Sequence, residues 1–553
     1  MIVNQRFGIL YGKVYQKIAL FIAIVAICLV SFGVLFRFPS YSYIKAITYY
    51  GDRSSWVFNF WSSDLTQINQ DFNRIRSEGF NCIVLVVPWG EFQPGLKPIT
   101  YNKYALTRLK YVIQVAYNHK LDVVLRISYL WDLYPKEQLP NISRFESLFT
   151  NPSIKQSWLR YIAKLNQTTS TYGNVRFSFI SWEDFWWPYM DLVNQYNNTS
   201  DSVVVANKIG YQAWLQSHLT LNSIDKIYKS SFNSYSQVPL PNNLYEKILE
   251  YRFFDYWFSN MYKLAQKKYP QLTIEARVDF DPYIDSSGQF QWYKHFATYS
   301  NSKVGILGIY YAPYMGATVH NLSYTQTTTL LKNKLRETLR YTNGAKLFID
   351  QFNFYDNSPG YTSNAVITPG QRSRFLINAA PVLKKYTMGY ALWTYRNTTG
   401  NAVYNPSFAL LGKAWRLSGA VSFTNNHRYD YAQLKNSSSV SQNLPMILVP
   451  SSTQKPVFSI TARSLKKNAS IQITVGSETF NLSLTTRWKI IRHTIDNASI
   501  SNNTRISIKD AGVSVCITKV ELYYPPKAQS MILGERGRPL RDLNAIEQLN
   551  KLL

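Results

Sequence analysis

Two adjacent carboxylates, Glu183 and Asp184, stand inside the aromatic segment FSFISWEDFWWPY (Phe177–Tyr189), where a run of strand-forming residues ends. A charge is expensive to remove from water, so acids crowded by rings usually pair with a base or take part in chemistry. Burial beside rings raises the pKa of a carboxyl group, which would suit Glu183 to protonating a departing oxygen. The alternative for Glu183 is an ion pair with an arginine. Asp184 is expected to point to the other side of the strand and to form a salt bridge or a cap.

Strand and helix patterns alternate around these acids. One helical pattern has Ser63 as its N-cap and Gly79 at its end, and two more follow at about residues 104–117 and 154–170. The expected strands are WVFNFW (Trp56–Trp61), NCIVLVVPW, LDVVLRISY, VRFSFISWED, LTIEARVDF, KVGILGIYYAPY, AKLFIDQFNF and TMGYALWTY. Eight strands over roughly 350 residues predict an α/β fold, a (β/α)8 TIM barrel. A doubly wound open sheet gives the same alternation, but the sequence has no Gly-rich phosphate loop to support it.

The polar and aromatic residues at the strand ends define the expected site, because catalytic groups of such barrels lie at the C-terminal ends of the strands. In chain order these residues are Trp89, Glu91, Arg126, Tyr129, Glu183, Asp184, Arg277, Asp279, Asp281, Tyr310, Tyr311, Asp350, Gln351, Trp393, Tyr395 and Arg396. Carboxylates, arginines and rings therefore converge on one face.

One long segment resembles a known group of enzymes. The run VPWGEFQPGLKPITYNKYALTRLKYVIQVAYNHKLDVVLR is similar to the second and third barrel strands of cellulase-like and β-galactosidase-like glycoside hydrolases. The stretches SWEDFW, IEARVD, FIDQFNFYDNSPGY and GYALWTYRNTTGNAVYNPSFAL resemble a poorly characterised cellulase-like group of that clan. The resemblance covers roughly Trp56 to Leu410 and implies a retaining glycosidase barrel.

The resemblance assigns roles to two positions. Glu183, at the end of the fourth strand, matches the general acid/base of the clan. The nucleophile of the clan is usually a Glu at the end of the seventh strand, where this chain has Gln351. A neutral amide cannot form a glycosyl ester, so a retaining mechanism would need Asp350 or an acid from another strand.

The fifth predicted strand offers two such acids. Glu275, Arg277 and Asp279 alternate and therefore share one face. The candidates for the second catalytic carboxylate are, in order of preference, Asp350, Glu275 and Asp279, acting as a nucleophile or as the base of an inverting reaction. The alternative is that all three belong to a charge network with Arg126 and Arg277.

Aromatic residues are expected to form the sugar subsites. Trp393 matches the usual sugar platform of the clan, although any one of the other rings could fill the core instead. The expected substrate-binding residues are Trp89, Glu91, Arg126, Tyr129, Trp187, Arg277, Tyr311, Gln351 and Trp393. The six histidines are dispersed and the three cysteines are isolated, so we expect neither a metal nor another cofactor.

The N-terminus predicts a membrane anchor. Residues 18–36, IALFIAIVAICLVSFGVLF, carry no charge and are long enough to cross a bilayer as a helix. Arg6, Lys13 and Lys17 precede them, which places residues 1–17 in the cytoplasm and the rest of the chain outside. A cleaved signal peptide is the alternative. About ten N-x-S/T sequons, Asn141, Asn321 and Asn397 among them, follow the span and are compatible with a glycoprotein.

The charge balance constrains the partners. A net charge of +28 attracts nucleic acid, anionic lipid or acidic polysaccharide. The Lys and Arg residues are scattered and no nucleic-acid motif accompanies them, so we expect an extracellular polysaccharide or envelope polymer and no nucleic acid. A basic surface with no partner is the alternative.

The chain changes character after the predicted barrel, residues 45–415. Residues 416–525 contain short alternating segments separated by Asn, Gly or Ser, which predict an all-β sandwich. It resembles the jelly-roll carbohydrate-binding modules of glycosidases, with Trp488 as one candidate sugar contact, or it could simply brace the barrel. Residues 526–553 predict a helical tail that docks on this chain or on a partner. Two functions remain open, a membrane-anchored glycoside hydrolase and a non-catalytic glycan-binding or polysaccharide-assembly protein.

Overall fold

The computed structural model describes residues 43–51, 60–62, 65–130, 141–277, 281–300, 305–311, 321–352, 366–367, 369–396, 401–424, 430–444, 455–467, 469–501, 504–524, 539 and 541–553. The chain divides into two units, Met1–Tyr43 and Ile44–Leu553. Within the described ranges, no helix is long and apolar enough to cross a membrane. The predicted anchor at residues 18–36 lies outside them.

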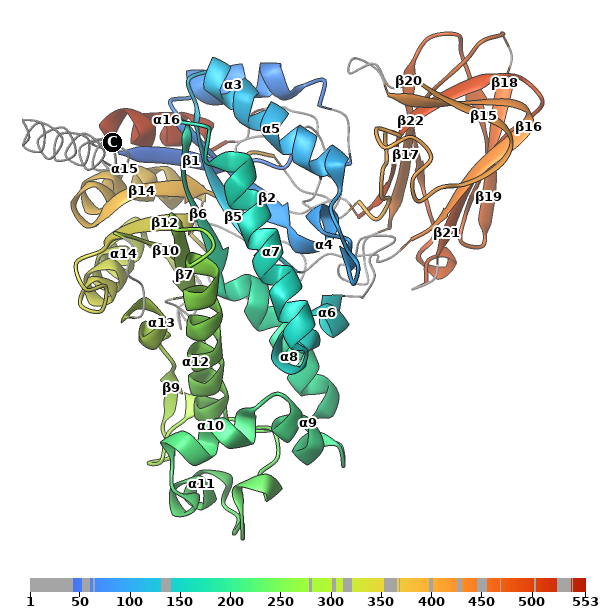
Figure 1. Cartoon of the computed structure of the whole chain (residues 1–553). Coiled ribbons are helices and arrows are strands. Elements are labelled where there is room, and N and C mark those ends of the chain that lie inside the picture. Colours follow the sequence, from blue (N-terminus) through green and yellow to red (C-terminus); the bar gives the residue numbers. More distant parts are fainter. Residues whose placement is uncertain are drawn as a thin grey trace, which may run out of the picture. The chain divides into compact units, whose positions relative to one another are not determined.

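Eight parallel strands close into a barrel surrounded by helices (Figure 1), which confirms the predicted barrel. In order round the barrel the strands are β1 (Ile44–Thr48), β14 (Thr387–Leu392), β12 (Lys346–Phe352), β10 (Ile306–Tyr311), β7 (Leu272–Arg277), β6 (Val175–Ser181), β5 (Asp122–Tyr129) and β2 (Cys82–Pro88). The longer helices are α3 (Ile68–Ser77), α5 (Lys103–Asn118), α7 (Pro152–Thr169), α8 (Trp182–Tyr196), α12 (Lys247–Gln266), α14 (Tyr324–Leu339) and α15 (Pro369–Tyr386).

The first predicted strand is wrong. The strand that closes the barrel is β1, which pairs with β2 and β14. Of the predicted strand Trp56–Trp61, only Phe60 and Trp61 are among the described residues, and neither is in a strand. Phe60 and Trp61 are buried, and Trp61 Nε1 donates to the carbonyl of Val86. Their aromatic pattern therefore reflects packing against the barrel. The helix expected from Ser63 begins at Ile68, and Ser63 itself lies outside the described residues.

Local sequence explains the other elements. Every residue of β2, CIVLVVP, is buried, as expected for a parallel strand covered on both faces. Asn102 caps α5 by accepting a hydrogen bond from the backbone N–H of Ala105. Asn151 caps α7 in the same way, and Pro152 occupies the first helical position, where its missing N–H costs nothing.

Short helices and two-stranded pairs lie in the connections between the barrel strands. The connection from β6 to β7 is the longest, and in Figure 1 its helices α9, α10 and α11 lie at the lower end of α12. These and the other short helices are α4 (Trp89–Phe92), α6 (Asn141–Thr150), α9 (Ser202–Lys208), α10 (Tyr211–His218), α11 (Leu221–Tyr228) and α13 (Phe296–Ser300). Two-stranded pairs form between β3 (Gly95–Leu96) and β4 (Ile99–Thr100), β8 (Pro282–Ile284) and β9 (Phe290–Trp292), and β11 (Asn321–Leu322) and β13 (Val366–Ile367).

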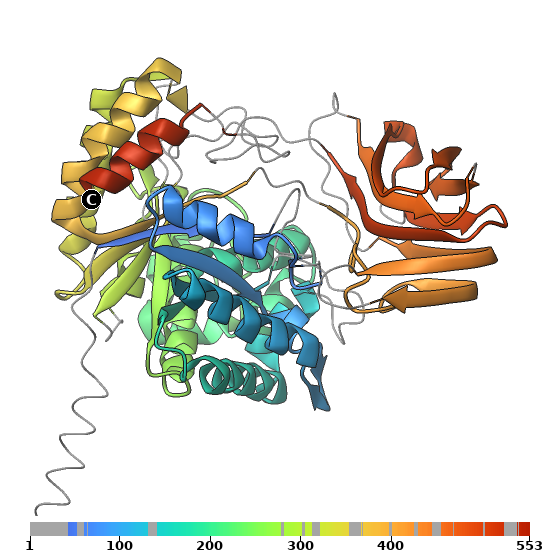
Figure 2. The same cartoon turned by 90° about the horizontal axis from the view of Figure 1, so that it is seen from above.

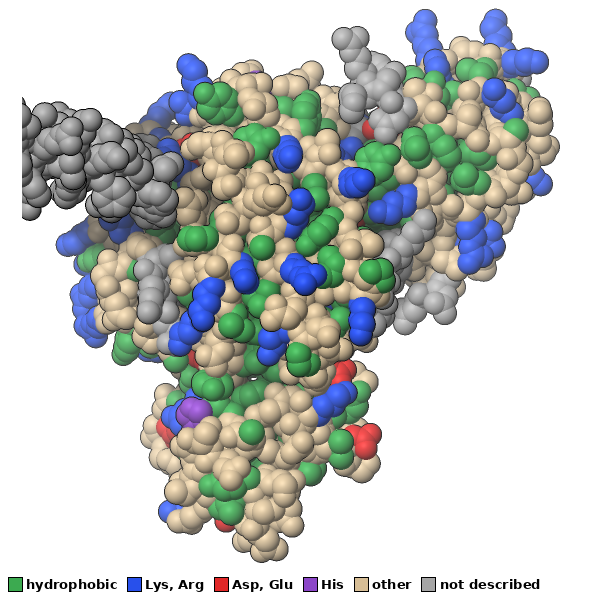
Figure 3. All heavy atoms as spheres, viewed as in Figure 1, with side chains coloured by type: hydrophobic (Ala, Val, Ile, Leu, Met, Phe, Trp, Pro, Cys, Tyr) green, Lys and Arg blue, Asp and Glu red, His purple; other side chains and the backbone are tan. Residues whose placement is uncertain are grey.

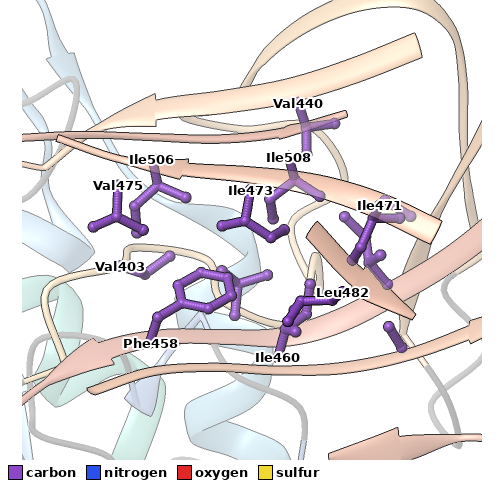
Figure 4. Packing of buried hydrophobic residues seen from close by; sticks show 14 of the residues in the cluster. Val403, Val440, Phe458, Ile460, Ile471, Ile473, Val475, Leu482, Ile506 and Ile508 are labelled. Carbon is purple, nitrogen blue, oxygen red and sulfur yellow. The ribbon is translucent and has the colours of Figure 1, made fainter. Parts of the chain in front are cut away.

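The C-terminal region is an antiparallel β-sandwich, as predicted. Its strands are β15 (Arg416–Thr424), β16 (Tyr431–Asn443), β17 (Val457–Ser464), β18 (Ala469–Val475), β19 (Glu478–Leu484), β20 (Lys489–Thr494), β21 (Arg505–Asp510) and β22 (Val515–Tyr523). Figure 4 shows Ile473 and Ile508 pointing from one layer toward Phe458 and Ile460 on the other. Alternating apolar residues thus meet between the layers.

The C-terminal helix α16 (Leu543–Leu552) docks on this chain beside α15 (Figure 2). Asn550 is buried at this contact. Its Oδ1 accepts a hydrogen bond from Tyr390 Oη at 2.7 Å, and its Nδ2 donates to the carbonyl of Glu78 at 3.1 Å. Of the two places left open for the tail, the structure shows the one on the barrel.

Candidate active site

Arg126 on β5 is the centre of the charged site. Its Nε donates to Asp184 Oδ2 at 2.9 Å, one NH2 donates to Asp184 Oδ1, and the same NH2 donates to Glu183 Oε2 at 3.0 Å. Burial alone would lower the pKa of Arg126, but the negative charges of Asp184 and Glu183 raise it well above its usual value. The guanidinium is therefore a permanent cation at this site.

The two adjacent acids face the same arginine because the strand ends before them. β6 stops at Ser181, and Glu183 and Asp184 lie in the first turn of α8. The expectation that Asp184 would point to the opposite side of a continuing strand is therefore wrong, while its expected salt bridge is present. Carboxylates in the first turn also favour the positive end of the helix dipole.

A bulge in β12 brings a second pair of side chains to the site. Across Asp350 and Gln351, β12 advances two residues while β10 advances one. Such a bulge re-aims side chains. Gln351 Nε2 donates to Glu183 Oε2 at 2.7 Å, and the charges of Glu183 and Arg126 reach Asp350. The residue at the clan's nucleophile position is thus in direct contact with the residue at its acid/base position.

Glu275 on β7 and Asp350 form a buried carboxyl pair. The exposed fraction of Glu275 is 0% and that of Asp350 is 1%, and no described residue hydrogen-bonds to either oxygen of Asp350. Burial raises the pKa of Glu275 to about 8, with Arg126 opposing the shift. Burial and the neighbouring Glu275 raise the pKa of Asp350 well above its usual value. Gly308 makes room for this pair, since a Cβ built on it would lie 2.9 Å from Glu275 Cβ.

The rings next to Glu183 in sequence differ in their surroundings. Trp182 stacks on Trp186 with ring centroids 4.7 Å apart, and both rings pack edge-on against Phe254 of α12. Trp187 is instead exposed, at 40%, one helical turn after Glu183. Glu183 has the arginine partner that was the alternative to a purely aromatic setting.

Aromatic residues do gather beside the site. Trp393 is half-buried and packs against Tyr50, Val86 and Tyr129. The rings of Tyr50 and Trp393 meet edge-on at 5.4 Å, and the guanidinium of Arg126 lies 5.8 Å from the centroid of Tyr129. Trp393, the predicted sugar platform, thus packs against Tyr129, which lies next to Arg126.

Two predicted sugar contacts are core residues. Trp89 is completely buried under the guanidinium of Arg144, and its Nε1 donates to Gln93. Glu91 is buried too, where it accepts hydrogen bonds from Asn102 Nδ2 and Tyr404 Oη, and burial raises its pKa to about 7. Neither side chain is exposed to a ligand.

Three further predicted site residues are Arg277, Asp279 and Tyr311. Arg277 is buried on the same face of β7 as Glu275. Asp279 lies outside the described residues, and only the backbone of Tyr311 is described. Among the described residues no group of His, Cys, Asp and Glu could hold a metal ion.

Comparisons with solved structures find distant similarities. An exo-beta-1,4-mannosidase from Opitutaceae bacterium strain TAV5 is 12% identical, with 65% of this chain and 52% of that chain covered and a TM-score of 0.41. A GH5_18 protein from Streptomyces cattleya in complex with Manb1-4GlcNAc is 12% identical, with 65% of this chain and 72% of that chain covered and a TM-score of 0.42. A beta-galactosidase from the psychrophilic Marinomonas ef1 is 10% identical, with 64% of this chain and 54% of that chain covered and a TM-score of 0.44.

These similarities assign no activity, substrate or catalytic residue to this chain. This chain spans about half the length of the first of these proteins. No family model matches the chain, and no curated protein matches it either.

A buried histidine cluster was missed from the sequence. His295 Nδ1 lies 2.6 Å from Asp255 Oδ1, and its Nε2 lies 2.7 Å from Asp281 Oδ2. Burial would lower the pKa of His295, but the two aspartates raise it to about 9. Asp281 was identified as a strand-end residue, whereas His295 and Asp255 are 40 residues apart and no local motif connects them.

Proposed function

We propose that this protein is a membrane-anchored, extracytoplasmic glycoside hydrolase that cleaves a polysaccharide with Glu183 as its general acid/base. One observation carries the proposal. Both donors to Glu183, from Arg126 and Gln351, bind Oε2, and no described residue donates to Oε1. Of the four clustered carboxyl groups, Glu183 also has the most exposed side chain, at 12%, so its Oε1 is the oxygen able to meet a substrate.

The geometry suits proton transfer to a glycosidic oxygen. Arg126 and Gln351 fix the carboxylate in one orientation, so a proton on Oε1 would be held in place for the leaving group. After bond cleavage, the ionised Glu183 stabilised by Arg126 would accept a proton from water. The half-buried Trp393 and the exposed Trp187 would supply rings for sugar C–H faces.

The surface supports an extracellular polymer as the partner. Lys and Arg side chains spread over the face in Figure 3, and few acids lie among them. Such a surface attracts an anionic glycan or envelope. The apolar segment at residues 18–36 would anchor the chain, with the N-terminus in the cytoplasm, and the β-sandwich could bind glycan. Sequons such as Asn321, which is exposed, would carry glycans if the chain is glycosylated.

The test uses the full chain in detergent with a panel of neutral and acidic polysaccharides, and reducing ends as the readout. Glu183→Gln should lower the rate by about a hundredfold or more with an unchanged unfolding midpoint. The matched control is Glu146→Gln, because Glu146 forms a surface pair with Lys208. A fully active Glu183→Gln protein would remove the proposal.

Gln351 favours a second candidate, a non-catalytic glycan-binding or polysaccharide-assembly protein. An amide replaces the carboxylate that a two-carboxylate retaining mechanism needs at this position. A binding protein should keep its glycan affinity when Glu183 is replaced by Gln, and the wild type should hydrolyse no member of the panel. Measurable turnover by the wild type would exclude it.

A further inference from the structure

A glycosidase that retains configuration needs a group to attack the anomeric carbon, and no described carboxylate of the site is suited to that step. Asp184 gives both oxygens to Arg126 and is fully buried. Glu275 and Asp350 are buried next to each other, and an enclosed carboxyl pair of this kind holds protons near neutral pH. A protonated carboxyl group is a poor nucleophile.

The side chain beside the acid/base is an amide with a defined orientation. Gln351 Nε2 donates to Glu183, which directs the amide Oε1 away from that carboxylate. No described residue donates to this Oε1. An amide oxygen accepts hydrogen bonds and cannot lose or gain a proton at neutral pH, so it is suited to hold an N–H group of a ligand.

We infer that the substrate is a 2-acetamido sugar whose own acetamido oxygen is the nucleophile, with Gln351 Oε1 accepting the acetamido N–H and Glu183 as acid/base. The inference rests on the proposed glycosidase function and names its substrate class. It also explains why a neutral side chain can stand where the clan has a carboxylate. Some glycosidase families replace the enzyme nucleophile with a substrate group in this way.

The chemistry balances without a further reactant. The acetamido carbonyl oxygen forms a bond to C1 while the glycosidic C1–O bond breaks, and the departing oxygen takes the proton of Glu183. The acetamido N–H keeps its proton and donates to Gln351, so the intermediate is a cyclic oxazolinium ion. Water then attacks C1 and gives a proton to Glu183, and the bond from C1 to the carbonyl oxygen breaks. The product retains the anomeric configuration.

The experiment compares substrates that differ only at C2. The full chain in detergent is given β-1,4-linked hexamers of N-acetylglucosamine or glucose, together with 4-nitrophenyl β-glycosides of both sugars and of the matching galactose pair. We expect kcat/KM to be at least about a thousandfold higher for the acetamido member, since only it carries the nucleophile. Trifluoroacetyl in place of acetyl should lower kcat by roughly a hundredfold, because fluorine withdraws electron density from the attacking oxygen.

The outcomes separate this inference from the proposed function. Comparable hydrolysis of the 2-hydroxy sugars, or of any polysaccharide without acetamido groups, overturns the inference and leaves the glycosidase in place. A covalent adduct of a 2-fluoro sugar on Asp350 or Asp279, found by mass spectrometry, does the same. No hydrolysis of any substrate removes both. Gln351→Ala should lower kcat/KM for acetamido substrates about tenfold or more in protein that still unfolds cooperatively, and equal activity would also count against the inference.

Discussion

Arg126 and Asp184 form a two-pronged ion pair in which the guanidinium and the carboxylate are both buried. The planar fork of arginine matches the two carboxylate oxygens, and this geometry offsets the cost of taking both charges out of water. The pair also fixes Arg126 for its third contact, with Glu183. Stability and site geometry therefore depend on the same interaction.

Removing one charge of the Arg126–Asp184 pair should lower the free energy of unfolding. Asp184→Asn leaves Arg126 buried with a weaker partner, and we expect the free energy of unfolding to fall by about 3 kcal/mol or more. Urea denaturation followed by tryptophan fluorescence measures the loss. The matched control is Asp122→Asn, because Asp122 on β5 pairs with Arg176 on β6 at a partly exposed position and should cost about 1 kcal/mol or less. Equal losses in the two variants would show that burial does not set the cost.

Glu275 should make the fold less stable as the pH rises. Its pKa is about 8 in the folded protein and near 4.5 in the unfolded chain, so between these values the folded state binds more protons. The free energy of unfolding then falls with pH across that interval. Glu275→Gln, which is neutral at every pH, should gain on the order of 3 kcal/mol relative to the wild type between pH 5 and 8.5. Denaturation at a series of pH values, with Glu146→Gln as the control, would contradict this if the two variants had the same slope.

The stabilising contribution of His295 should depend on pH at higher values. Its pKa is about 9 in the fold and 6.5 in the unfolded chain, so its stabilising contribution is complete below pH 6.5 and is lost as the pH rises through 9. The difference in stability between the wild type and His295→Gln should shrink by about 3 kcal/mol between pH 6 and 10. The control is His493→Gln, which removes a partly exposed histidine paired with Glu478. A pH-independent difference for His295→Gln would exclude the charged Asp–His–Asp cluster.

The barrel was predictable from the sequence because buried parallel strands have a local signature. β2 is apolar throughout and is followed by Trp89 and a capped helix, and this pattern repeats along the chain. The position of the first strand was predicted wrongly for a physical reason. IKAIT is only five residues long, and the aromatic run that ends at Trp61 carries a stronger apolar signal, although Trp61 itself donates to Val86 of β2 and is not in a strand.

The site was predictable as a set of residues but not as a set of contacts. Arg126, Glu183, Asp350 and Gln351 were all identified from their positions at strand ends. The bulge that turns both Asp350 and Gln351 into the site is set by pairing with β10 and leaves no sequence signal. The enclosure of Glu275, where Gly308 makes room for it, likewise depends on neighbours distant in sequence.

The C-terminal helix should stabilise the barrel through one buried asparagine. Asn550→Ala removes the hydrogen bonds to Tyr390 Oη and to the carbonyl of Glu78, so we expect a loss of about 1–3 kcal/mol in the free energy of unfolding. The control is Lys551→Ala, since Lys551 is exposed on the same helix. Unfolding midpoints that agree between the two variants would show that α16 adds no stability through this contact.

The same contact can be tested from its other side. Gly79 has φ +89°, and a Cβ built on it would lie 2.9 Å from Asn550 Cβ, so Gly79→Ala adds both backbone strain and a collision with α16. If α16 is seated there in solution, the loss in the Gly79→Ala, Asn550→Gly double variant should be smaller than the sum of the two single losses, because glycine removes the Cβ that the added methyl group would meet. Strictly additive losses would mean that the two residues do not touch.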